Sequence, residues 1–418
     1  MFKFIHCADL HLGATFKSLT AKCDAMLKKI IADSSFESWN KLIDKAIAEK
    51  VDFVIISGDI FDSAKPMLRS RMIFKHGVNE LIQAGIKVFI VNGNHDDKLT
   101  IFNEFSFGEQ VKVFSADKVE VCELPELKVA VAGISYDNDN ARENLSLAFK
   151  GLSLPEDYFK IAVLHANIGG VKNLADEESG CYSNCQLSDL TIQKFDYWAL
   201  GHIHNGGVLH KEKPLVVYPG SLQGLNINQD TPKGAYLVAV NSNNEAELTF
   251  FECGELGFCR KEVDLSEVAN DHDFIEKITV LRDDLLKVYK NNKLIFTELI
   301  FTGRSKFYSK LRSESELELL QSVQFMLGDK FFLNNLNLLV APVVDNEKLL
   351  RNNPLLSDIL SVDDTGELGK SFLSEKIRHL RNKFPLLDSY SDSDIEKMID
   401  YSKNELFKLF AENEGDLS

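Results

Sequence analysis

Five short segments of the chain carry side chains that can bind divalent metal ions, and each follows an apolar run typical of a buried strand. The residues concerned are Asp9 and His11, Asp59 and Asp62, Asn94, His95 and Asp96, His165, and His202 and His204. In an open α/β sheet, ligands bind beyond the carboxyl ends of the strands. The five segments are therefore predicted to meet at one site.

Each segment taken alone has an ordinary structural explanation. Gly58-Asp59 and Gly93-Asn94 are common turn pairs, a single buried His165 is more often a hydrogen-bonded core residue, and one His-x-His pair is weak evidence for a metal. Their recurrence at five strand ends of one domain favours a metal centre over five unrelated turns.

The donor atoms in these segments belong to carboxylates, imidazoles and one amide, without thiolates. This set suits Mn²⁺, Fe or Zn²⁺ better than Ca²⁺ or a structural zinc ion. Seven ligands are too many for one ion with open positions, but they suit two ions that share a carboxylate. Two ions roughly 3.5–4 Å apart stabilise the attacking and the leaving oxygen together in phosphoryl transfer.

The hydrophobic pattern predicts an α/β layered domain, with β-sheets flanked by helices, over residues 1–240. The expected strands are Phe2–His6, Asp52–Ser57, Ile86–Asn92, Val129–Ile134, Lys160–His165 and Tyr197–Gly201. The expected helices lie near Phe36–Glu49, Leu68–Ala84 and Ala141–Lys150. Antiparallel strands are expected after His204, at Pro214–Tyr218, Gly234–Val240 and Ala246–Phe251, with a turn at Asn241–Asn244.

We expect three regions: a main domain over residues 1–260, a small α+β accessory (capping) domain over 261–345, and a helical region over 346–418. The accessory elements expected are a helix near His272–Tyr289, a strand near Leu294–Phe301, a helix opened by a capping box at Ser313–Glu316 and ending near Leu327, and a strand at Phe331–Val344. An apolar stripe behind Ser393 suits either the protein's own core or a partner's coiled coil.

The composition is that of an ordinary globular protein, with 44% hydrophobic and 26% charged residues among 418. The formal charge is −16, and it divides evenly, −8 in residues 1–260 and −8 in residues 261–418. Such a balance is unlike the basic face by which DNA-binding proteins hold phosphates. A polyanionic substrate would have to be held by metal ions, by a local basic patch or by a partner.

The sequence favours a reducing, cytoplasmic location without membrane contact. Met1–His6 has strand character rather than that of a signal peptide, and no segment approaches the roughly 18 apolar residues needed to span a bilayer. The seven cysteines, at positions 7, 23, 122, 181, 185, 253 and 259, include no Cys-x-x-Cys pair. Cys181 and Cys185 are expected to be reduced thiols in a loop rather than to face each other on a helix.

The five segments together resemble the signature of the calcineurin-like metallophosphoesterases. Within that superfamily the chain resembles the SbcD-like nuclease subunits of the double-strand-break repair complex. The similar stretches are His6–Gly13, Gly58–Asp62, Asp196–His204, Tyr218–Gly224 and Pro232–Gly234. The likeness covers about residues 1–240, is looser to about residue 344, and continues only as a helical tail like that of the YhaO-type branch.

This resemblance implies two Mn²⁺ ions. It assigns Asp9, His11, Asp59 and His204 to one ion, and Asp59, Asn94, His165 and His202 to the other. Asp59 bridges them in this assignment, and a bridging ligand needs the two oxygens and full charge that only a carboxylate offers. The resemblance further implies DNA as the substrate, an ATPase partner of the SMC-like type with a long coiled coil, and a homodimer.

His95 lies beside a ligand without being one, so we expect it to be catalytic. It would donate a proton to the leaving 3′ oxygen, or stabilise charge on the phosphoryl group during in-line attack. Asp62 and Asp96 are candidates for orienting the ligating histidines, although Asp62 suits a helix cap equally well.

The densest basic run near the site follows Asp62 and contains Lys65, Arg69, Arg71 and Lys75. These side chains would contact DNA phosphates, which positions DNA without reading its sequence. The alternative is that they form an ordinary solvated helix face.

Three functions follow from these features. The leading hypothesis is a Mn²⁺-dependent DNA-repair exonuclease that digests from 3′ ends, with endonuclease action as a further activity. The alternative enzyme is a small-molecule or phosphoprotein phosphoesterase with the same metal centre, since fold and metal do not define the substrate. A non-catalytic scaffold is the third, and the complete ligand set argues against it.

Overall fold

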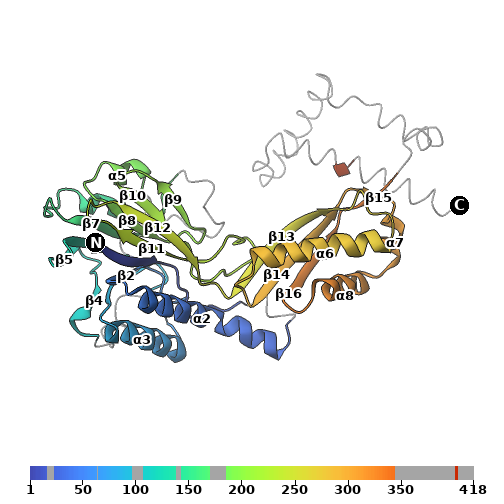
Figure 1. Cartoon of the computed structure of the whole chain (residues 1–418), viewed down its shortest axis with the longest axis horizontal. Helices are drawn as coiled ribbons and strands as arrows, with labels where there is room; N and C mark the ends of the chain where they lie inside the picture. The colour runs from blue at the N-terminus through green and yellow to red at the C-terminus, as the bar shows by residue number, and fades with distance from the viewer. Residues whose placement is uncertain are drawn as a thin grey trace, which may run out of the picture. The chain divides into compact units, whose positions relative to one another are not determined.

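The computed structural model describes residues 1–16, 23–63, 65–96, 107–137, 143–169, 185–343 and 401–402 of the chain (Figure 1). The chain divides into two compact units. The first is Met1–Arg260, Leu285–Glu298 and Asp329–Asn334, and the second is Lys261–Asp284, Leu299–Gly328 and Asn335–Ser418. The helices predicted for 346–418 lie outside the described residues, apart from Tyr401 and Ser402. No helix in the described part of the chain combines the length and the apolar character needed to cross a membrane.

One six-stranded sheet, in the order β12-β11-β1-β2-β3-β4, contains the first three strands predicted to carry ligands. The parallel strands are β1 (Phe2–Cys7), β2 (Phe53–Ser57), β3 (Lys87–Val91) and β4 (Val111–Val113). The antiparallel strands β11 (Gly234–Val240) and β12 (Ala246–Glu252) extend the sheet beyond β1. The central strands are mostly apolar and buried because both faces of the sheet are covered.

A second six-stranded sheet contains the other two strands predicted to carry ligands. Its order is β5-β6-β7-β8-β10-β9. Its strands are β5 (Glu120–Leu124), β6 (Val129–Ile134), β7 (Phe159–His165), β8 (Tyr197–Gly201), β10 (Leu215–Tyr218) and β9 (Gly207–His210). The inner four strands run parallel, and β5 and β9 are antiparallel edges. The predicted strands are confirmed to within two residues, whereas the short edge strands β4, β5 and β9 were not predicted.

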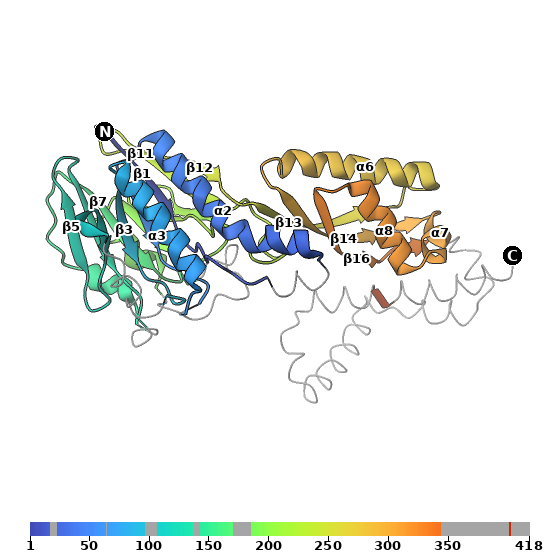
Figure 2. The same ribbon diagram turned by 90° about the horizontal axis from the view of Figure 1, so that it is seen from below.

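Helices cover the outer faces of the two sheets and complete a layered α/β architecture, as predicted. Figure 2 shows α2 (Ala25–Glu49) and α3 (Leu68–Gln83) lying over the first sheet, and their apolar residues share one core with it. A short 3-10 helix, η3 (Leu145–Phe149), and α5 (Leu187–Thr191) pack on the second sheet. The helix predicted at Ala141–Lys150 is therefore wrong for its described part, which is a single 3-10 segment.

Helix α2 begins eleven residues before the predicted start at Phe36. Asp24 caps it by accepting a hydrogen bond from the Leu27 amide at 2.8 Å. Its buried face includes Ser34 and Ser38, whose hydroxyls donate to the Ile31 and Ser34 carbonyls of the helix itself. These buried hydroxyl side chains interrupt the hydrophobic period on both sides of Phe36, so the period does not extend back to the start of the helix.

The two sheets are joined by a core of aromatic and branched side chains from their facing surfaces. Phe4 and Phe53 stack with ring centroids 5.0 Å apart, and Phe89 meets Phe53 edge to face at 5.5 Å. Tyr197 of the second sheet packs edge-on against Phe4 at 5.4 Å. This core fixes the separation of the two sheets, and therefore the separation of the strand ends that they carry.

The remainder of the described chain forms a three-stranded sheet, a strand pair and three helices. The sheet has the order β13-β14-β16, with β13 (Leu256–Asp264), β14 (Leu294–Thr302) and β16 (Phe331–Leu338), and β15 (Arg304–Ser305) pairs with β17 (Ala341–Pro342). The helices are α6 (Asp271–Val288), α7 (Tyr308–Ser313) and α8 (Glu316–Leu327).

Two predictions about these elements are corrected. The capping box of α8 pairs Ser315 with Glu318 rather than Ser313 with Glu316, because Ser313 is still helical, in α7. The strand predicted at Phe331–Val344 is two strands, β16 and β17, in different sheets.

Replacing Phe53 by Ala should lower the free energy of unfolding by about 3–5 kcal/mol, because it removes a fully buried ring between the sheets. The measurement is urea unfolding followed by tryptophan fluorescence. Phe325→Ala is the control, since that ring is 87% exposed and its loss should change stability by about 0.5 kcal/mol or less. Equal midpoints for Phe53→Ala and wild type would contradict this account of the core.

Candidate metal centre

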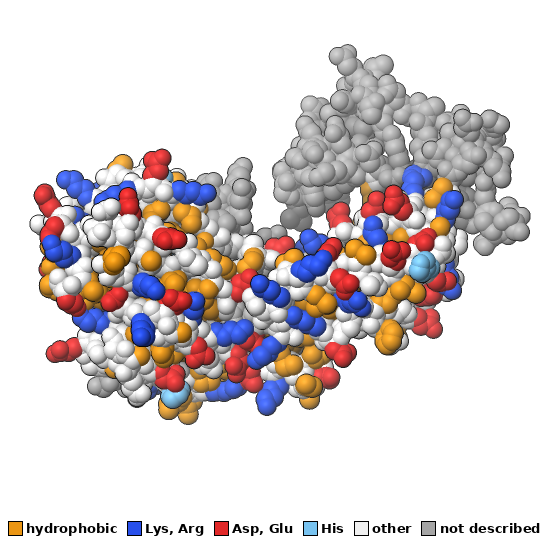
Figure 3. Space-filling model, in the orientation of Figure 1, with side chains coloured by type: hydrophobic (Ala, Val, Ile, Leu, Met, Phe, Trp, Pro, Cys, Tyr) orange, Lys and Arg blue, Asp and Glu red, His pale blue; other side chains and the backbone are white. Residues whose placement is uncertain are grey.

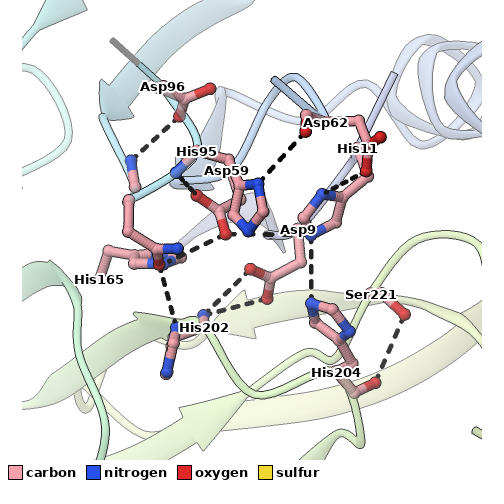
Figure 4. Close-up of polar contacts among 12 residues, drawn as sticks. Asp9, His11, Asp59, Asp62, His95, Asp96, His165, His202, His204 and Ser221 are labelled. Carbon is pink, nitrogen blue, oxygen red and sulfur yellow. Dashed lines mark hydrogen bonds and ion pairs between the residues drawn. The ribbon is translucent and has the colours of Figure 1, made fainter. Parts of the chain in front are cut away.

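The five predicted segments meet where the carboxyl ends of strands from both sheets lie together (Figure 4). The first sheet contributes the residues after β1, β2 and β3, including Asp9, Asp59 and Asn94. The second sheet contributes His165, the last residue of β7, and the loop after β8 with His202 and His204. The site therefore depends on how the two sheets pack.

Two groups of three side chains could each hold an ion. Asp9, His11 and His204 form one group, and Asp59, His165 and His202 form the other; within each, one ligand atom per residue lies within 4.8 Å of the others. In the first group His11 Nε2 and His204 Nε2 are 3.1 Å apart. In the second group Asn94 Oδ1 lies 3.0 Å from His165 Nε2 and 3.2 Å from His202 Nδ1. All seven predicted ligands thus lie in one compact cluster.

Asp59 lies between the two groups. Its Oδ2 is 3.5 Å from His165 Nε2 and 3.9 Å from His11 Nε2, which belong to different groups. Its Oδ1 accepts a hydrogen bond from the His95 amide at 2.9 Å. One carboxylate oxygen is therefore oriented by the backbone while the other lies between the two groups.

Four of the clustered residues have left-handed backbone conformations, which non-glycine residues rarely adopt. The φ angles are 50° at Asp9, 41° at His11, 50° at Asp59 and 105° at His202. Each such residue costs on the order of 1–3 kcal/mol and persists only where the surroundings hold it. Their concentration at one place marks the strand ends as a functional site.

Backbone hydrogen bonds hold these conformations. Beyond β1 and β2, the amides of Asp9, His11 and Leu12 donate to the carbonyls of Gly58, Asp59 and Ile60 at 2.9–3.1 Å. Gly58 itself has φ 93°, and a Cβ there would collide with the ring of His165. The strained residues are thus fixed by pairing between neighbouring loops.

The second sheet is tied to the first through the ligands themselves. The His202 amide donates to both carboxylate oxygens of Asp9 at 3.1 Å. His165 Nδ1 donates to the Ser57 carbonyl at 2.9 Å, which leaves its Nε2 lone pair facing the cluster. The same contacts that join the sheets therefore orient the donor atoms.

Burial and the charges of neighbouring side chains shift the pKa values of the clustered residues. Burial, together with the neighbouring Asp59, raises the pKa of Asp9 well above its usual range. Burial would also raise the pKa of Asp59, but His165, His11 and His95 around it lower that pKa to about 2. Burial lowers the pKa of His165, and lowers that of His204 well below its usual value.

These protonation states fit a metal centre only in part. The ionised Asp59 and the neutral imidazoles of His165 and His204 offer lone pairs, as metal coordination requires. Burial would lower the pKa of His11, but Asp62, Asp59 and Asp9 around it raise that pKa to about 9, so an ion would have to displace a proton there. The donor set of oxygen and nitrogen atoms without sulfur suits divalent transition metals. The donor atoms of the two candidate groups therefore suit divalent metal ions.

The three residues predicted beside the ligands lie at the site in different ways. The His95 side chain is exposed, its Nδ1 lies 3.3 Å from the Asp62 carbonyl, and its ring centroid is 5.1 Å from that of His11. Asp62 Oδ1 lies 3.6 Å from His11 Nδ1. The structure thus brings Asp62 near a histidine of the cluster.

Asp96 contacts backbone rather than a histidine. Its buried carboxylate accepts hydrogen bonds from the amides of Ile60, Phe61 and Gly93 at 3.0–3.2 Å. Burial and the nearby Asp59 raise its pKa to about 7. Asp96 therefore holds the loop that carries Asp59.

The predicted basic run is only partly directed to solvent. Lys65 is exposed, whereas Arg71 and Lys75 are half-buried. Arg69 pairs with Asp33 of α2 at 2.7 Å, and its guanidinium lies 4.6 Å from the centroid of the Phe36 ring. Arg69 thus has intramolecular partners on α2.

Sequence reasoning missed several residues that support the ligands. Gln229 Nε2 lies 2.7 Å from His204 Nδ1, and Lys233 Nζ donates to the His204 carbonyl at 2.8 Å. Tyr218 donates to the Ala166 carbonyl, next to His165, at 2.6 Å. Tyr218 and Lys233 lie in stretches noted only for a family likeness, and Gln229 lies between those stretches. Polar residues in a loop rich in Asn, Gln and Asp gave no signal of burial.

Comparisons with known proteins agree with this geometry. The family model of calcineurin-like phosphoesterases matches residues 2–206. The chain is 30% identical over 309 residues to an uncharacterized metallophosphoesterase, YhaO, of Bacillus subtilis, covering 72% of this chain and 71% of that protein. It is 26% identical over 289 residues to the DNA double-strand break repair protein Mre11 of Methanocaldococcus jannaschii, covering 66% of this chain and 72% of that protein.

Two further similarities are weaker. The Mre11 protein of Sulfurisphaera tokodaii is 26% identical over 281 residues, covering 59% of this chain and 67% of that protein. A dimetal phosphatase structure from Danio rerio superposes with a TM-score of 0.38 at 10% identity, covering 60% of this chain and 96% of the other. The matched family model and the YhaO likeness, taken with the layered α/β fold, establish that the chain belongs to the calcineurin-like phosphoesterases.

Proposed function

We propose that this protein is a two-metal DNA-repair exonuclease, which hydrolyses phosphodiesters of DNA from 3′ ends with endonuclease action as a further activity. The observation that carries the proposal is the pair of ligand groups joined by Asp59 at the meeting point of the two sheets. Support for DNA as the substrate comes from the relatives, of which several are described as double-strand break repair proteins.

The proposed ligands divide between two ions. Asp9, His11, Asp59 and His204 would hold one ion, and Asp59, Asn94, His165 and His202 the other, with Mn²⁺ as the metal. When bound, the two ions activate water and neutralise charge on the attacking and leaving oxygens. Asp59 is the bridging residue in this assignment because its Oδ2 lies within 3.9 Å of a histidine from each group.

His95 is the residue proposed to act on the substrate. Its ring is exposed while its backbone amide donates to Asp59 Oδ1, so a solvent-accessible imidazole lies beside the ligands on a backbone that Asp59 holds. An imidazole in that position can donate a proton to the leaving 3′ oxygen or stabilise phosphoryl charge. Asp62, 3.6 Å from His11, and Asp96, which holds the Asp59 loop, would maintain the geometry of the ligands.

The charge distribution of the surface supports the proposal that DNA binding needs a partner. On the face in Figure 3, Lys and Arg side chains are interspersed with Asp and Glu over the described residues. Lys65 and Arg71 stay candidates for phosphate contact, and Arg69 would first have to leave Asp33. An ATPase partner with a long coiled coil would supply additional affinity for DNA. A cytoplasmic homodimer stays a prediction.

A small-molecule or phosphoprotein phosphoesterase is the second candidate, and the net charge of −16 favours it, since such a substrate needs no extended basic surface. A direct assay separates the two. Purified protein with Mn²⁺ is incubated with end-labelled linear duplex, a single-stranded circle and bis-p-nitrophenyl phosphate, with EDTA controls. We expect EDTA-sensitive shortening of the duplex. Hydrolysis of the small ester alone, even with a coiled-coil ATPase added, would reject DNA as the substrate.

Replacing Asp59 by Asn should abolish binding of both ions, because the shared ligand loses its charge. His11→Ala should weaken only one ion, since the other group keeps its histidines. Isothermal titration with Mn²⁺ gives the stoichiometry, and turnover of the small ester should fall at least about 1,000-fold in Asp59→Asn, the loss expected when metal chemistry is lost. Retention of two ions by Asp59→Asn would show that Asp59 is not the bridge.

Replacing His95 by Ala should keep both ions and lower turnover by about 100–10,000-fold, the usual contribution of a general acid. The matched control is His76→Ala, an exposed histidine of α3 beside Glu80, which should leave turnover unchanged. Mn²⁺ titration and the rate of shortening of the end-labelled duplex measure the two effects separately, because the leaving 3′ oxygen of DNA needs a proton. Full turnover in His95→Ala would remove this residue from the mechanism.

A further inference from the structure

His6 is a polar side chain in the core between the two sheets. It lies in β1, three residues before Asp9, and is fully buried. Because side chains alternate along a strand, it faces the same side of the first sheet as Phe4, toward the second sheet. Its ring meets that of Tyr197 edge to face, with the centroids 5.7 Å apart. A histidine thus occupies a place where its neighbours are aromatic.

The imidazole of His6 has hydrogen-bond partners in both sheets. Its Nδ1 lies 3.0 Å from the Tyr197 hydroxyl of β8. Its Nε2 lies 3.2 Å from the Leu200 carbonyl, also in β8, and 3.2 Å from the Ser57 hydroxyl of β2. His6 therefore connects β1 and β2 of the first sheet with β8 of the second.

These partners define the tautomer of His6. A carbonyl only accepts hydrogen bonds, so Nε2 carries the hydrogen and donates to Leu200, while Nδ1 accepts from the Tyr197 hydroxyl. Burial lowers the pKa of His6 to about 3, against the opposing effect of the Leu200 carbonyl, so the ring is neutral near pH 7. Both nitrogens are thus used, one as a donor and one as an acceptor, in fixed directions.

The contacts of His6 lie directly beneath the ligands. The Ser57 carbonyl accepts the hydrogen bond that orients His165, at 2.9 Å, and the Ser57 hydroxyl donates to the Ala199 carbonyl of β8 at 3.1 Å. Leu200 precedes Gly201, where a Cβ would collide with the Ser57 carbonyl. The ends of β2 and β8 therefore meet at this junction, one or two residues before Asp59 and His202.

Both ligand groups combine side chains from the two sheets. Asp9 meets His204 in one group, and Asp59 meets His165 and His202 in the other. A displacement of one sheet against the other would therefore change ligand distances in both groups. Apolar packing is non-directional and tolerates small displacements, whereas hydrogen bonds depend steeply on direction.

We propose that His6 is a positioning residue, which fixes the second sheet against the first so that the ligands of both groups reach their ions together. The proposal rests on the metal centre of the proposed function and is independent of the substrate. His6 acts through Ser57 and β8 rather than by touching an ion.

The test compares wild type, His6→Leu and His6→Leu/Tyr197→Phe as full chains, by isothermal titration with Mn²⁺ and by thermal unfolding without metal. His6→Leu leaves the buried Tyr197 hydroxyl without this acceptor, so the melting temperature should fall. The double variant also removes that hydroxyl and should recover part of the loss. The affinity for both ions should fall about 10–100-fold in both variants, the usual loss when a residue supporting the ligands is removed.

His210→Leu is the matched control. Its Nδ1 lies 3.2 Å from the Glu212 carbonyl and 2.8 Å from the Pro214 carbonyl, in the turn between β9 and β10 rather than between the sheets. This variant should bind both ions as wild type does. A loss of Mn²⁺ affinity equal to that of His6→Leu would overturn the proposal.

The remaining outcomes are distinct. Affinity that is unchanged in His6→Leu, or that recovers with the melting temperature in the double variant, overturns the role of His6 and leaves the metal centre intact. The absence of Mn²⁺ binding by wild type overturns both the proposal and the proposed function. The expected losses support the proposal even where DNA is not cleaved, and only the substrate assignment then fails.

Tyr197→Phe alone carries the test if His6→Leu does not fold. It keeps the imidazole and removes only the donor to Nδ1, so it should weaken the binding of both ions by about 10-fold. Wild-type affinity for Mn²⁺ in that variant would then overturn the proposal.

Discussion

The site depends on the burial of two carboxylates, Asp9 and Asp59, at the junction of the two sheets. Burial without a cation is costly for such groups, and the raised pKa of Asp9 reflects it. Backbone amides offset part of this cost. The His202 amide donates to Asp9 across the sheets, and the His95 amide donates to Asp59. These contacts stabilise the charges in part and leave oxygen lone pairs for an ion. The hydrogen bonds of these buried carboxylates therefore both join the two sheets and orient oxygen atoms that could bind a metal ion.

The same contacts explain why strained backbone is tolerated. Asp9, His11, Asp59 and His202 all have positive φ angles, and each lies in a loop paired with another loop. Asp96 fixes the Asp59 loop through the amides of Ile60, Phe61 and Gly93. Rigid support of this kind gives the precise placement that metal and catalytic groups require. Substitution of Asp96 would therefore disturb the placement of Asp59 without removing a ligand.

Much of this was predictable from the sequence, because strand-end ligands obey a local rule. A buried strand followed by Gly-Asp or Gly-Asn places a donor at a sheet edge, and all seven proposed ligands lie together in the structure. The division of the strands between two sheets was not predictable, since β3 and β7 have the same apolar pattern. The supporting residues were also missed, because the burial of Gln229 and of Ser34 depends on hydrogen bonds that no hydrophobic period records.

Ser57 and Gln229 hold two histidines of the cluster in different ways. Ser57 presents a main-chain carbonyl from β2 to His165, and the position of this carbonyl follows from the sheet rather than from a side chain. Gln229 presents a side chain from an irregular loop to His204, so this contact depends on the identity of one residue. The orientation of His165 is therefore fixed by the fold, whereas that of His204 also depends on a single side chain.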